Sequence, residues 1–348
     1  ADSLAELMGQ CDFVSVHTPL NAETRGLIGK DAFAAAKKGM ILINTARGAI
    51  VDVDATNKRC RVEPGITVDD LNDRLSAMGG AVGGLFFAPD PATSRHANIG
   101  GCIGNNAAGA RSIRYGRTSE SLLGVQVAMV EGERLTFEKG AAARDPRVAA
   151  LTRRVADIVL PLAGEIRARF PRTIRRNAGY ALDMVLSGIE QDPAGLTGVN
   201  LAHLVCGSEG TLAVTLGARL KLHEKPRAKG LAVLGFSDLD EAIAAVMPIL
   251  ATGPSAVELL DDMVVGLAGA NAEYRRYVEL MPAPADGKPL KAVLYVEYFS
   301  TSGPEEVRAK FAELARAVPG VAKQDHTDAG AMLNAWKLRK AGEPLLHG

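Results

Sequence analysis

The chain has 348 residues, 47% of them hydrophobic, and its 40 basic and 40 acidic residues give a formal net charge of zero. This balance argues against nucleic acid or an anionic membrane surface as the main partner, and an aromatic content of 5% with one tryptophan leaves few side chains on which bases would stack. The length exceeds that of a usual single hydrophobic core, so we expect two or three domains.

The cysteines and the first residues further limit the class of protein and its expected location. The four cysteines lie far apart and form no Cys-x-x-Cys pair, which fits neither a disulfide framework nor a zinc or iron–sulfur site. We expect reduced, mostly buried thiols and no metal site. No apolar run approaches the ~20 residues of a membrane span, and the acidic start of the chain lacks the features of a signal peptide, so a cytoplasmic location is expected. The cysteines are Cys11, Cys60, Cys102 and Cys206.

The first fifty residues have the pattern of a strand, a helix and a second strand. Short β-rich runs cover residues 13–17 and 40–44, and the alanine-rich residues 30–38 between them end at Gly39, a helix stop. This order predicts two parallel strands in one sheet, because such strands are joined by a crossover helix.

The stretch CDFVSVHTPLNAETRGLIGKDAFAAAKKGMILINTARGAIVD resembles the later part of the NAD domain of D-2-hydroxy-acid dehydrogenases of the phosphoglycerate dehydrogenase type. The resemblance covers residues 1 to about 52. It implies that Arg47, in the NTARG motif, contacts a substrate carboxylate. Because no G-x-G-x-x-G follows a strand and nothing after residue 52 continues this family, we expect no NAD binding here and a structural or solvated Arg47.

From residue 53 the sequence no longer resembles an NAD domain. Residues 58–64 predict a strand, and Thr67 predicts the N-cap of a helix that runs to residue 78. A glycine-rich stretch, residues 89–109, then leaves the backbone bare of large side chains. Such a stretch suits either a large ligand lying on the main chain or an ordinary surface loop.

Three stretches in this part resemble the FAD-linked D-2-hydroxy-acid dehydrogenases, a group that includes the glycolate oxidase subunit, D-lactate dehydrogenases and D-2-hydroxyglutarate dehydrogenase. They read VDATNKRCRVEPGITVDDLNDRL, LFFAPDPATSRHANIGGCIGNNAAGARSIRYGRT and HLVCGSEGTLAVTLGARLKL. The resemblance runs from about residue 53 to the last residue. It implies FAD as the cofactor and the vanillyl-alcohol-oxidase type of FAD-binding fold.

The two resemblances together predict an α+β chain of three parts. Residues 1–52 are a Rossmann-like fragment of an NAD domain, residues 53–227 an FAD-binding domain, and residues 228–348 an incomplete substrate or cap domain. In the resembled family a glycine-rich loop upstream of the VEPG strand holds the FAD pyrophosphate, and here the NAD-type fragment occupies its place. The FAD-binding domain is therefore expected to be partial and to retain FAD poorly.

The resemblance also implies which residues bind the cofactor. Gly100 and Gly101 would leave room for a pyrophosphate or ribityl chain and donate their amides to it. Asn105 and Asn106 either bond flavin or ribityl oxygens or cap the next turn. Tyr180 either packs against the cofactor or is a core tyrosine with one hydroxyl partner. The predicted cofactor residues are Pro89, Asp90, Ser94, Gly100, Gly101, Asn105, Asn106, Gly109, Tyr115, Gly116, Gly207, Glu209 and Gly210.

Two further elements are predicted in the central part. Residues 122–130 and 135–137 predict a β-hairpin that turns at Glu131 and Gly132. Residues 145–170 predict a helix with one apolar face that packs into the core. That face consists of Val148, Leu151, Val155, Ile158 and Val159.

The last third of the chain predicts the order strand, helix, strand twice, which corresponds to the cap of the resembled family. Residues 283–288, rich in Pro, Ala and Gly, predict an exposed connection between the two copies. The first helix is capped by Ser237 or Asp238, and Pro304 opens the second. The predicted elements are 231–236, 239–250 and 255–260, then 292–299, 304–318 and 321–323.

The cap resemblance also implies the substrate residues. The sequence WKLR resembles a tryptophan and an arginine that lie near the substrate in the family, so Arg339 is the candidate for holding the carboxylate of the hydroxy acid. The alternative is a helix-surface arginine. Oxidation also requires a base for the hydroxyl proton, and His326 is the histidine nearest the expected cap site. The family's H-x-G-D-G-N-x-H type motif, which supplies its metal site and base, is not found in this sequence.

The leading hypothesis is an FAD-dependent oxidoreductase that moves a hydride from a D-2-hydroxy acid of the lactate, glycolate or 2-hydroxyglutarate class to flavin and passes the electrons to an acceptor. Because two functional parts of the family pattern are not found, we expect weak or absent activity. One alternative is a non-catalytic product of gene fusion or misassembly. Another is an NAD-dependent D-2-hydroxy-acid dehydrogenase, which the missing dinucleotide fingerprint disfavours.

Overall fold

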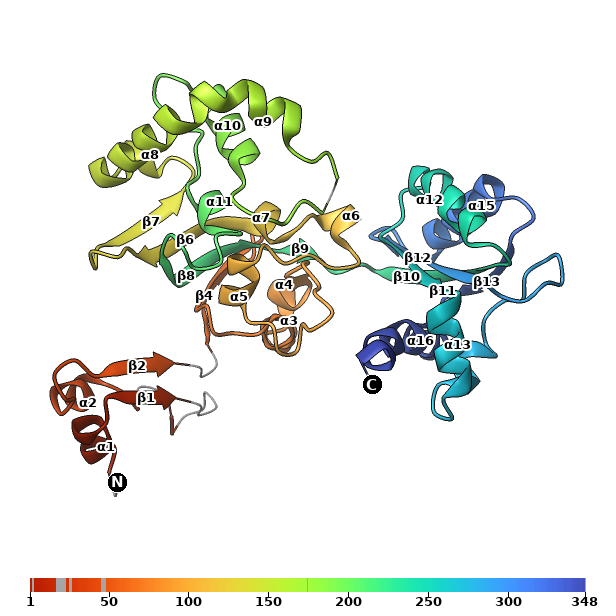
Figure 1. Ribbon diagram of the computed structural model, residues 1–348, viewed down its shortest axis with the longest axis horizontal. Coiled ribbons are helices and arrows are strands. Elements are labelled where there is room, and N and C mark those ends of the chain that lie inside the picture. The colour runs from red at the N-terminus through yellow and green to blue at the C-terminus, as the bar shows by residue number, and fades with distance from the viewer. Residues whose placement is uncertain (2, 17–22, 25–26, 45–47, 174, 348) are drawn as a thin grey trace. The chain divides into compact units, whose positions relative to one another are not determined.

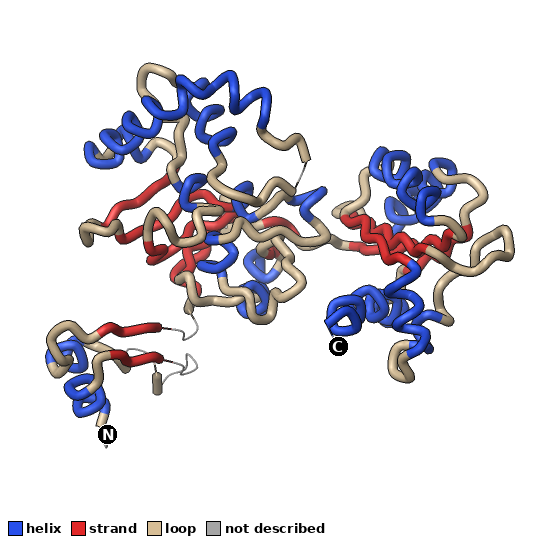
Figure 2. Tube along the Cα trace, viewed as in Figure 1, coloured by secondary structure: helices blue, strands red, loops and turns tan. Residues whose placement is uncertain are grey.

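The computed structural model describes residues 1, 3–16, 23–24, 27–44, 48–173 and 175–347. The chain divides into two compact units of helices and strands (Figures 1 and 2). Unit 1 comprises Ala1–Ala107 and Arg117–His223, and unit 2 comprises Ala108–Gly116 and Glu224–Gly348. Because unit 2 takes a short segment from the middle of unit 1, neither unit is formed by one continuous stretch of chain.

The start of unit 1 has the predicted parallel pair of strands. The strands β1 (Phe13–Val16) and β2 (Ile41–Asn44) pair in parallel, with Phe13 opposite Ile41. The helices α1 (Leu4–Gln10) and α2 (Lys30–Ala34) accompany them. Helix α2 ends earlier than predicted, and Gly39 follows with a φ of 86°. A small core of Met8, Val14 and Ala32 holds these elements together.

An antiparallel sheet of five strands forms the centre of unit 1, in the order β3-β4-β8-β6-β7. The predicted hairpin is confirmed, since β6 pairs antiparallel with β7 and Gly132 lies in the turn with a φ of 86°. The strands are β3 (Ile50–Asp54), β4 (Arg59–Val62), β6 (Leu122–Ala128), β7 (Arg134–Glu138) and β8 (Val214–Lys221). The short strands β5 (Leu85–Phe86) and β9 (His223–Glu224) lie outside this sheet.

Helices pack against the sheet around one large apolar core. The Thr67 hydroxyl caps α3 as predicted, because it accepts the Asp70 amide hydrogen at 3.2 Å. The helices of unit 1 are α3 (Val68–Ala77), α4 (Gly80–Gly83), α5 (Ile99–Gly104), α7 (Thr118–Ser121), α8 (Pro146–Val159), α9 (Ala163–Arg169), α10 (Leu182–Gln191) and α11 (Ala202–Val205), with a 3₁₀ turn at Ala141–Ala143.

The prediction of a single helix over residues 145–170 is wrong in one respect. A 3₁₀ turn at Leu160–Leu162 separates α8 from α9, and its central residue is a proline, which cannot donate a helical hydrogen bond. The predicted apolar face is also wrong at Ile158, which is 66% exposed, whereas Val148 and Val159 are buried.

Unit 2 has a four-stranded antiparallel sheet with helices on both faces (Figure 1). The strand order is β11-β12-β10-β13, so the order strand, helix, strand is repeated as predicted. One face packs against α12 and α15, and the other packs against α13, α14 and α16. The elements are β10 (Ala228–Phe236), α12 (Leu239–Ala251), β11 (Ala256–Asp261), α13 (Asp262–Ala270), α14 (Arg275–Val278), β12 (Ala292–Ser300), α15 (Pro304–Ala317), β13 (Ala322–His326), α16 (Ala329–His347) and, in the separate segment, α6 (Ser112–Tyr115).

Candidate functional site

Three segments that are far apart in the sequence meet in unit 1 at the end of α5. The Gly207 amide donates to the Ile103 carbonyl at 2.8 Å, and the Glu209 amide donates to the Gly104 carbonyl at 2.9 Å. Gly207 has a φ of 88°, and a Cβ placed on it would lie 2.8 Å from the Gly179 carbonyl oxygen. The glycine-rich stretch, the GSEG turn and the loop before α10 therefore form one site, and only glycine fits at position 207.

Asn106 lies at the centre of this site. Its backbone is left-handed, with a φ of 50°, and the residue is 1% exposed. Its Oδ1 accepts the Ser119 amide hydrogen at 3.0 Å and the Cys206 thiol at 3.5 Å. This oxygen is therefore engaged by the protein itself, as in the capping role that was one of the two alternatives for Asn106. Asn105 is the C-cap of α5 and is exposed.

Gly100 and Gly101 do not offer the amides that the sequence interpretation assigned to a pyrophosphate. They belong to the first turn of α5, where the Gly100 amide donates to the Pro64 carbonyl and the Gly101 amide to Asn98 Oδ1, both at 2.7 Å. A Cβ on Gly100 would lie 2.9 Å from the Pro64 Cβ. This glycine is therefore explained by close packing against the loop after β4, and the amide-donor prediction is wrong.

The other predicted cofactor residues fall into three groups. Pro89 is buried, and Asp90 and Ser94 are half-buried in the turns that precede α5. Gly109, Tyr115 and Gly116 belong to unit 2, where the Gly109 amide donates to the Ser112 hydroxyl. Glu209 and Gly210 are exposed, with φ angles of 52° and 77°. Arg47 lies outside the described residues.

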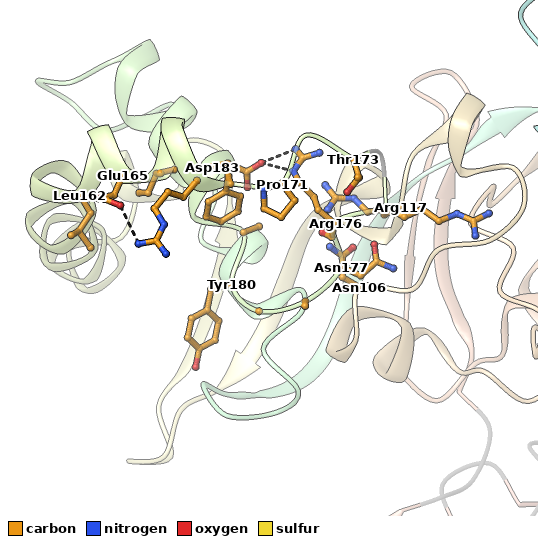
Figure 3. Close-up of a pocket in the computed structure, with 17 residues that line it drawn as sticks. Asn106, Arg117, Leu162, Glu165, Pro171, Thr173, Arg176, Asn177, Tyr180 and Asp183 are labelled. Atoms are coloured by element: carbon orange, nitrogen blue, oxygen red, sulfur yellow. Dashed lines mark hydrogen bonds and ion pairs between the residues drawn. The ribbon is translucent and has the colours of Figure 1, made fainter. Parts of the chain in front are cut away.

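A cavity of about 810 Å³ opens beside Asn106 (Figure 3). Its wall includes four arginines and two carboxylates, so positive charge prevails. A cavity of this size accommodates a large ligand. The lining residues include Asn106, Arg117, Glu165, Arg169, Phe170, Thr173, Arg175, Arg176, Asn177, Gly179, Tyr180 and Asp183.

The arginines of this wall are held by specific partners. Arg117 is 1% exposed, donates to the Arg176 carbonyl oxygen and forms an ion pair with Glu120 at 2.5 Å. Arg176 pairs with Asp183 at 2.6 Å. Burial alone would raise the pKa of Glu120, but the hydrogen bonds and charge of Arg117 lower it below its ordinary value. Arg117 thus fixes the loop that begins at Arg176.

Sequence reasoning missed Arg117 and Arg176. Arg117 occurs in a stretch quoted for the family resemblance, but nothing in the sequence pattern distinguishes a buried arginine from an exposed one. Tyr180 is 41% exposed and its hydroxyl lies 2.9 Å from the Thr211 Oγ1, so it has a hydroxyl partner but is not a core residue.

The residues present fit a large anionic cofactor such as FAD. Apart from their own chain neighbours, Gly104 and Gly179 have no described atom within 4 Å of where a Cβ would be, which leaves the backbone open at two places around the site. The Ser208 hydroxyl oxygen is buried and has no hydrogen-bond partner among the described residues. With the arginines, these features provide backbone access, an available hydroxyl and positive charge for a phosphate-containing ligand.

In unit 2 the predicted substrate arginine is also paired. Arg339 of α16 donates through Nε and Nη2 to Glu258 Oε2, at 3.0 and 2.6 Å. Trp336, in the same motif, stacks on Tyr295 with ring centroids 5.4 Å apart. His326 ends β13 and is half-buried, opposite Leu231 in the register. Arg339 and His326 therefore stay predictions as substrate residues.

The cysteines agree with the expectation of reduced, mostly buried thiols. Cys60, Cys102 and Cys206 are buried and free, and Cys11 is half-buried and free. Burial raises the pKa of Cys206 to about 12 and that of Cys102 to about 11, so these thiols are unreactive. Within the described ranges, no helix is both long and apolar enough to cross a bilayer.

Two protein-family models match separate parts of the chain. The NAD binding domain of D-isomer specific 2-hydroxyacid dehydrogenases matches residues 1–61, and the C-terminal domain of FAD linked oxidases matches residues 225–347. The first match covers the stretch that resembles an NAD domain and extends beyond the predicted boundary at residue 52, and the second falls in the predicted cap domain.

The chain is also similar to curated proteins. It is 28% identical to D-2-hydroxyglutarate dehydrogenase of Pseudomonas putida over 99% of this chain and 34% of that protein. It is 27% identical to the glycolate oxidase subunit GlcD of Escherichia coli, over 67% of this chain and 36% of that protein. It is 27% identical to the mitochondrial D-lactate dehydrogenase [cytochrome] 1 of Saccharomyces cerevisiae, over 65% of this chain and 29% of that protein. The chain thus spans about one third of the length of these relatives.

A solved structure of alkyldihydroxyacetonephosphate synthase shares the fold. Its TM-score is 0.54 at 16% identity, over 99% of this chain and 53% of that one. The chain thus has a mixed α/β fold of this kind. It is similar to FAD-linked dehydrogenases and oxidases of D-2-hydroxy acids, as its sequence predicted, and its residues 225–347 match the C-terminal domain of FAD linked oxidases.

Proposed function

We propose that the chain is part of an FAD-dependent oxidoreductase that oxidises a D-2-hydroxy acid to the 2-oxo acid. The observation that carries the proposal is the meeting of two family motifs and the loop before α10 around Asn106, beside an arginine-lined cavity. The family matches support FAD as the cofactor. When bound, FAD supplies the acceptor for the hydride that leaves the substrate α-carbon.

Residues of unit 1 bind the cofactor in this proposal, and residues of unit 2 bind the substrate. In unit 1, Arg117 orders the loop before α10, and the cavity arginines attract the phosphates of the cofactor. In unit 2, Arg339 holds the substrate carboxylate after being oriented by Glu258, and His326 takes the hydroxyl proton. We accordingly assign residues 53–227, apart from the segment 108–116 that belongs to unit 2, to cofactor binding and residues 228–348 to substrate binding.

The cofactor site is tested by reconstituting the purified chain with FAD and measuring the flavin absorption that remains after gel filtration. Arg175, exposed on the cavity wall, is compared with Arg172, which is exposed but not part of that wall. We expect R175M to weaken FAD binding about tenfold, because a charge-assisted contact is lost, and R172M to leave it unchanged.

Activity is then measured as dye reduction that depends on D-2-hydroxyglutarate, D-lactate or glycolate. A chain that stays colourless after reconstitution contradicts the proposal. NADH at micromolar concentration serves as the comparison ligand: its binding in place of FAD would favour the alternative of an NAD-dependent dehydrogenase, for which residues 1–61 are the matching segment.

A further inference from the structure

One helical ridge of unit 1 is strongly basic, although the chain as a whole has no net charge. It consists of α8, the 3₁₀ turn at Leu160–Leu162, α9 and the residues up to 172, and we call residues 146–172 the arginine ridge. Six arginines and two acidic residues give it a formal charge of +4, and it has no lysine. Figure 1 shows α8 and α9 in succession along one side of unit 1, so this charge is concentrated on one ridge.

Half of these arginines have no acidic partner. The other half form ion pairs, namely Arg147 with Asp145 at 2.8 Å, Arg167 with Glu190, and Arg169 with Glu165 at 3.5 Å. Arg153, Arg154 and Arg172 are exposed, and within the described ranges no carboxylate lies at ion-pair distance from them. The ridge therefore presents guanidinium groups whose charge the chain does not neutralise.

The middle of the arginine ridge exposes apolar side chains. Ile158 is 66% exposed, Leu160 49% and Leu162 45%. Ile158 lies one helical turn after Arg154, so the two side chains share one face of α8. The opposite face of this helix is already used, because its Val148, Ala156 and Val159 are buried in the core of unit 1. The outer face thus has an apolar centre with arginines before and after it.

This arrangement is that of a protein–protein interface, in which an apolar centre is surrounded by polar groups. Arginine is enriched in such interfaces and lysine is depleted, which agrees with the composition of the ridge. The planar guanidinium donates two parallel hydrogen bonds to one carboxylate. The complementary surface therefore carries carboxylates around an apolar patch.

An anionic membrane surface fits the arginine ridge less well. A helix that lies on a membrane has its apolar side chains on one face and its cations on the other. On α8 the apolar face packs into the protein, and Ile158 shares the outer face with Arg154. The ridge also has no tryptophan or tyrosine, the residues that favour the membrane interface.

We propose that the arginine ridge docks an acidic protein whose carboxylates surround an apolar centre. The ridge is small, since α8 is about 21 Å long, whereas a standard interface buries about 800 Å² on each partner. The complex is therefore transient, and its affinity falls as salt screens the charges. Docking uses side chains that the cofactor proposal does not need, so it can be tested without FAD.

The probe is a fluorescently labelled helical peptide of about 20 residues, long enough to span α8 and the 3₁₀ turn, with glutamates on both sides of a central leucine cluster. Its binding to the full chain is measured by fluorescence anisotropy at about 0.1 M ionic strength. We expect R153Q/R154Q to weaken binding about tenfold through the loss of two charged contacts. I158S should weaken it about tenfold through the loss of apolar burial.

Matched controls come from the helices of unit 2. R316Q replaces an exposed arginine of α15 and I243S an exposed isoleucine of α12, and both should bind the peptide as the unaltered chain does. A peptide with lysines in place of the glutamates should not bind. Because the substituted side chains are all exposed, we expect equal urea unfolding midpoints, which show that the variants are folded.

Two results overturn the proposal. One is no binding of the acidic peptide, or binding that R153Q/R154Q and I158S leave unchanged. The other comes from vesicles that contain phosphatidylglycerol: if the chain binds them and loses this binding in R153Q/R154Q, while the peptide does not bind, the arginine ridge contacts a membrane and not a protein.

Discussion

At the scale of single residues, the candidate site combines buried polar groups that depend on each other. Arg117 and Glu120 are paired, and His203 lies near enough for their charges to influence it. The Nδ1 atom of His203 is buried without a hydrogen-bond partner among the described residues. Such a histidine is held neutral in the folded chain, since an imidazolium there would lose its hydration.

We therefore expect His203 to make stability fall with acidity. Burial lowers the pKa of His203 below its ordinary value of 6.5, and this effect exceeds the opposing charges of Glu120 and Asp183. Below pH 6.5 the unfolded chain binds a proton that the folded chain does not, so the free energy of unfolding falls as the pH falls toward the lower folded pKa. The slope reaches at most about 1.4 kcal/mol per pH unit.

Urea unfolding at pH 7.5, 6.5 and 5.5 measures this slope. H203N should reduce it, whereas H96N, which replaces an exposed histidine, should not. An equal slope in the unaltered chain and H203N would show that His203 is protonated as readily in the folded state as in the unfolded one.

At the scale of elements, the GSEG turn is fixed by its backbone more than by its side chains. Gly207 and Gly210 both have positive φ angles, of 88° and 77°. A Cβ on Gly207 would lie 2.8 Å from the Gly179 carbonyl oxygen, whereas a Cβ on Gly210 would meet no described atom within 4 Å beyond its own chain neighbours. Replacing Gly210 by alanine therefore tests backbone strain alone, whereas replacing Gly207 tests backbone strain and steric clash together.

We expect G210A to lower the free energy of unfolding by about 1 kcal/mol, from the left-handed backbone alone. G207A should lower it by about 3 kcal/mol or more, because the loop at Gly179 must also move. Chemical unfolding of both variants measures the difference. Equal losses would mean that Gly207 and the loop before α10 are not in contact.

The elements show which parts of the sequence interpretation could succeed. The cap at Thr67, the hairpin at Gly132 and the repeated strand, helix, strand order of unit 2 depend on neighbours in the sequence, and all three were predicted. The amide of Gly100 was assigned wrongly because its partner, Pro64, is distant in the sequence, whereas the partner of the Gly101 amide, Asn98, lies three residues before it. Arg117 was missed for the same reason, since its carbonyl partner belongs to Arg176.

At the scale of the whole molecule, unit 2 depends on a segment taken from the middle of unit 1. Residues 108–116 supply Arg111 to the buried Glu297, and α6 adds Arg114 to the Phe299 carbonyl and the Ser255 hydroxyl. The predicted boundary between residues 227 and 228 divides the chain into continuous domains, so it does not place residues 108–116 in unit 2. The motif that contains Arg111 resembles part of the FAD-binding domain, and the sequence therefore assigned it there. The ion pair therefore links a family motif to the sheet of unit 2.

This dependence can be measured with a double-mutant cycle on Arg111 and Glu297. R111M leaves a buried carboxylate without its bidentate partner, so we expect the free energy of unfolding of unit 2 to fall by about 3 kcal/mol or more. The R111M/E297L double variant should recover most of this loss, because an apolar pair replaces the charged pair in the same space. R114M, which removes hydrogen bonds to uncharged acceptors, should cost less. If the double variant is as unstable as R111M, the loss comes from displacement of residues 108–116 and not from the unpaired charge of Glu297, and the segment would then be held by contacts other than this ion pair.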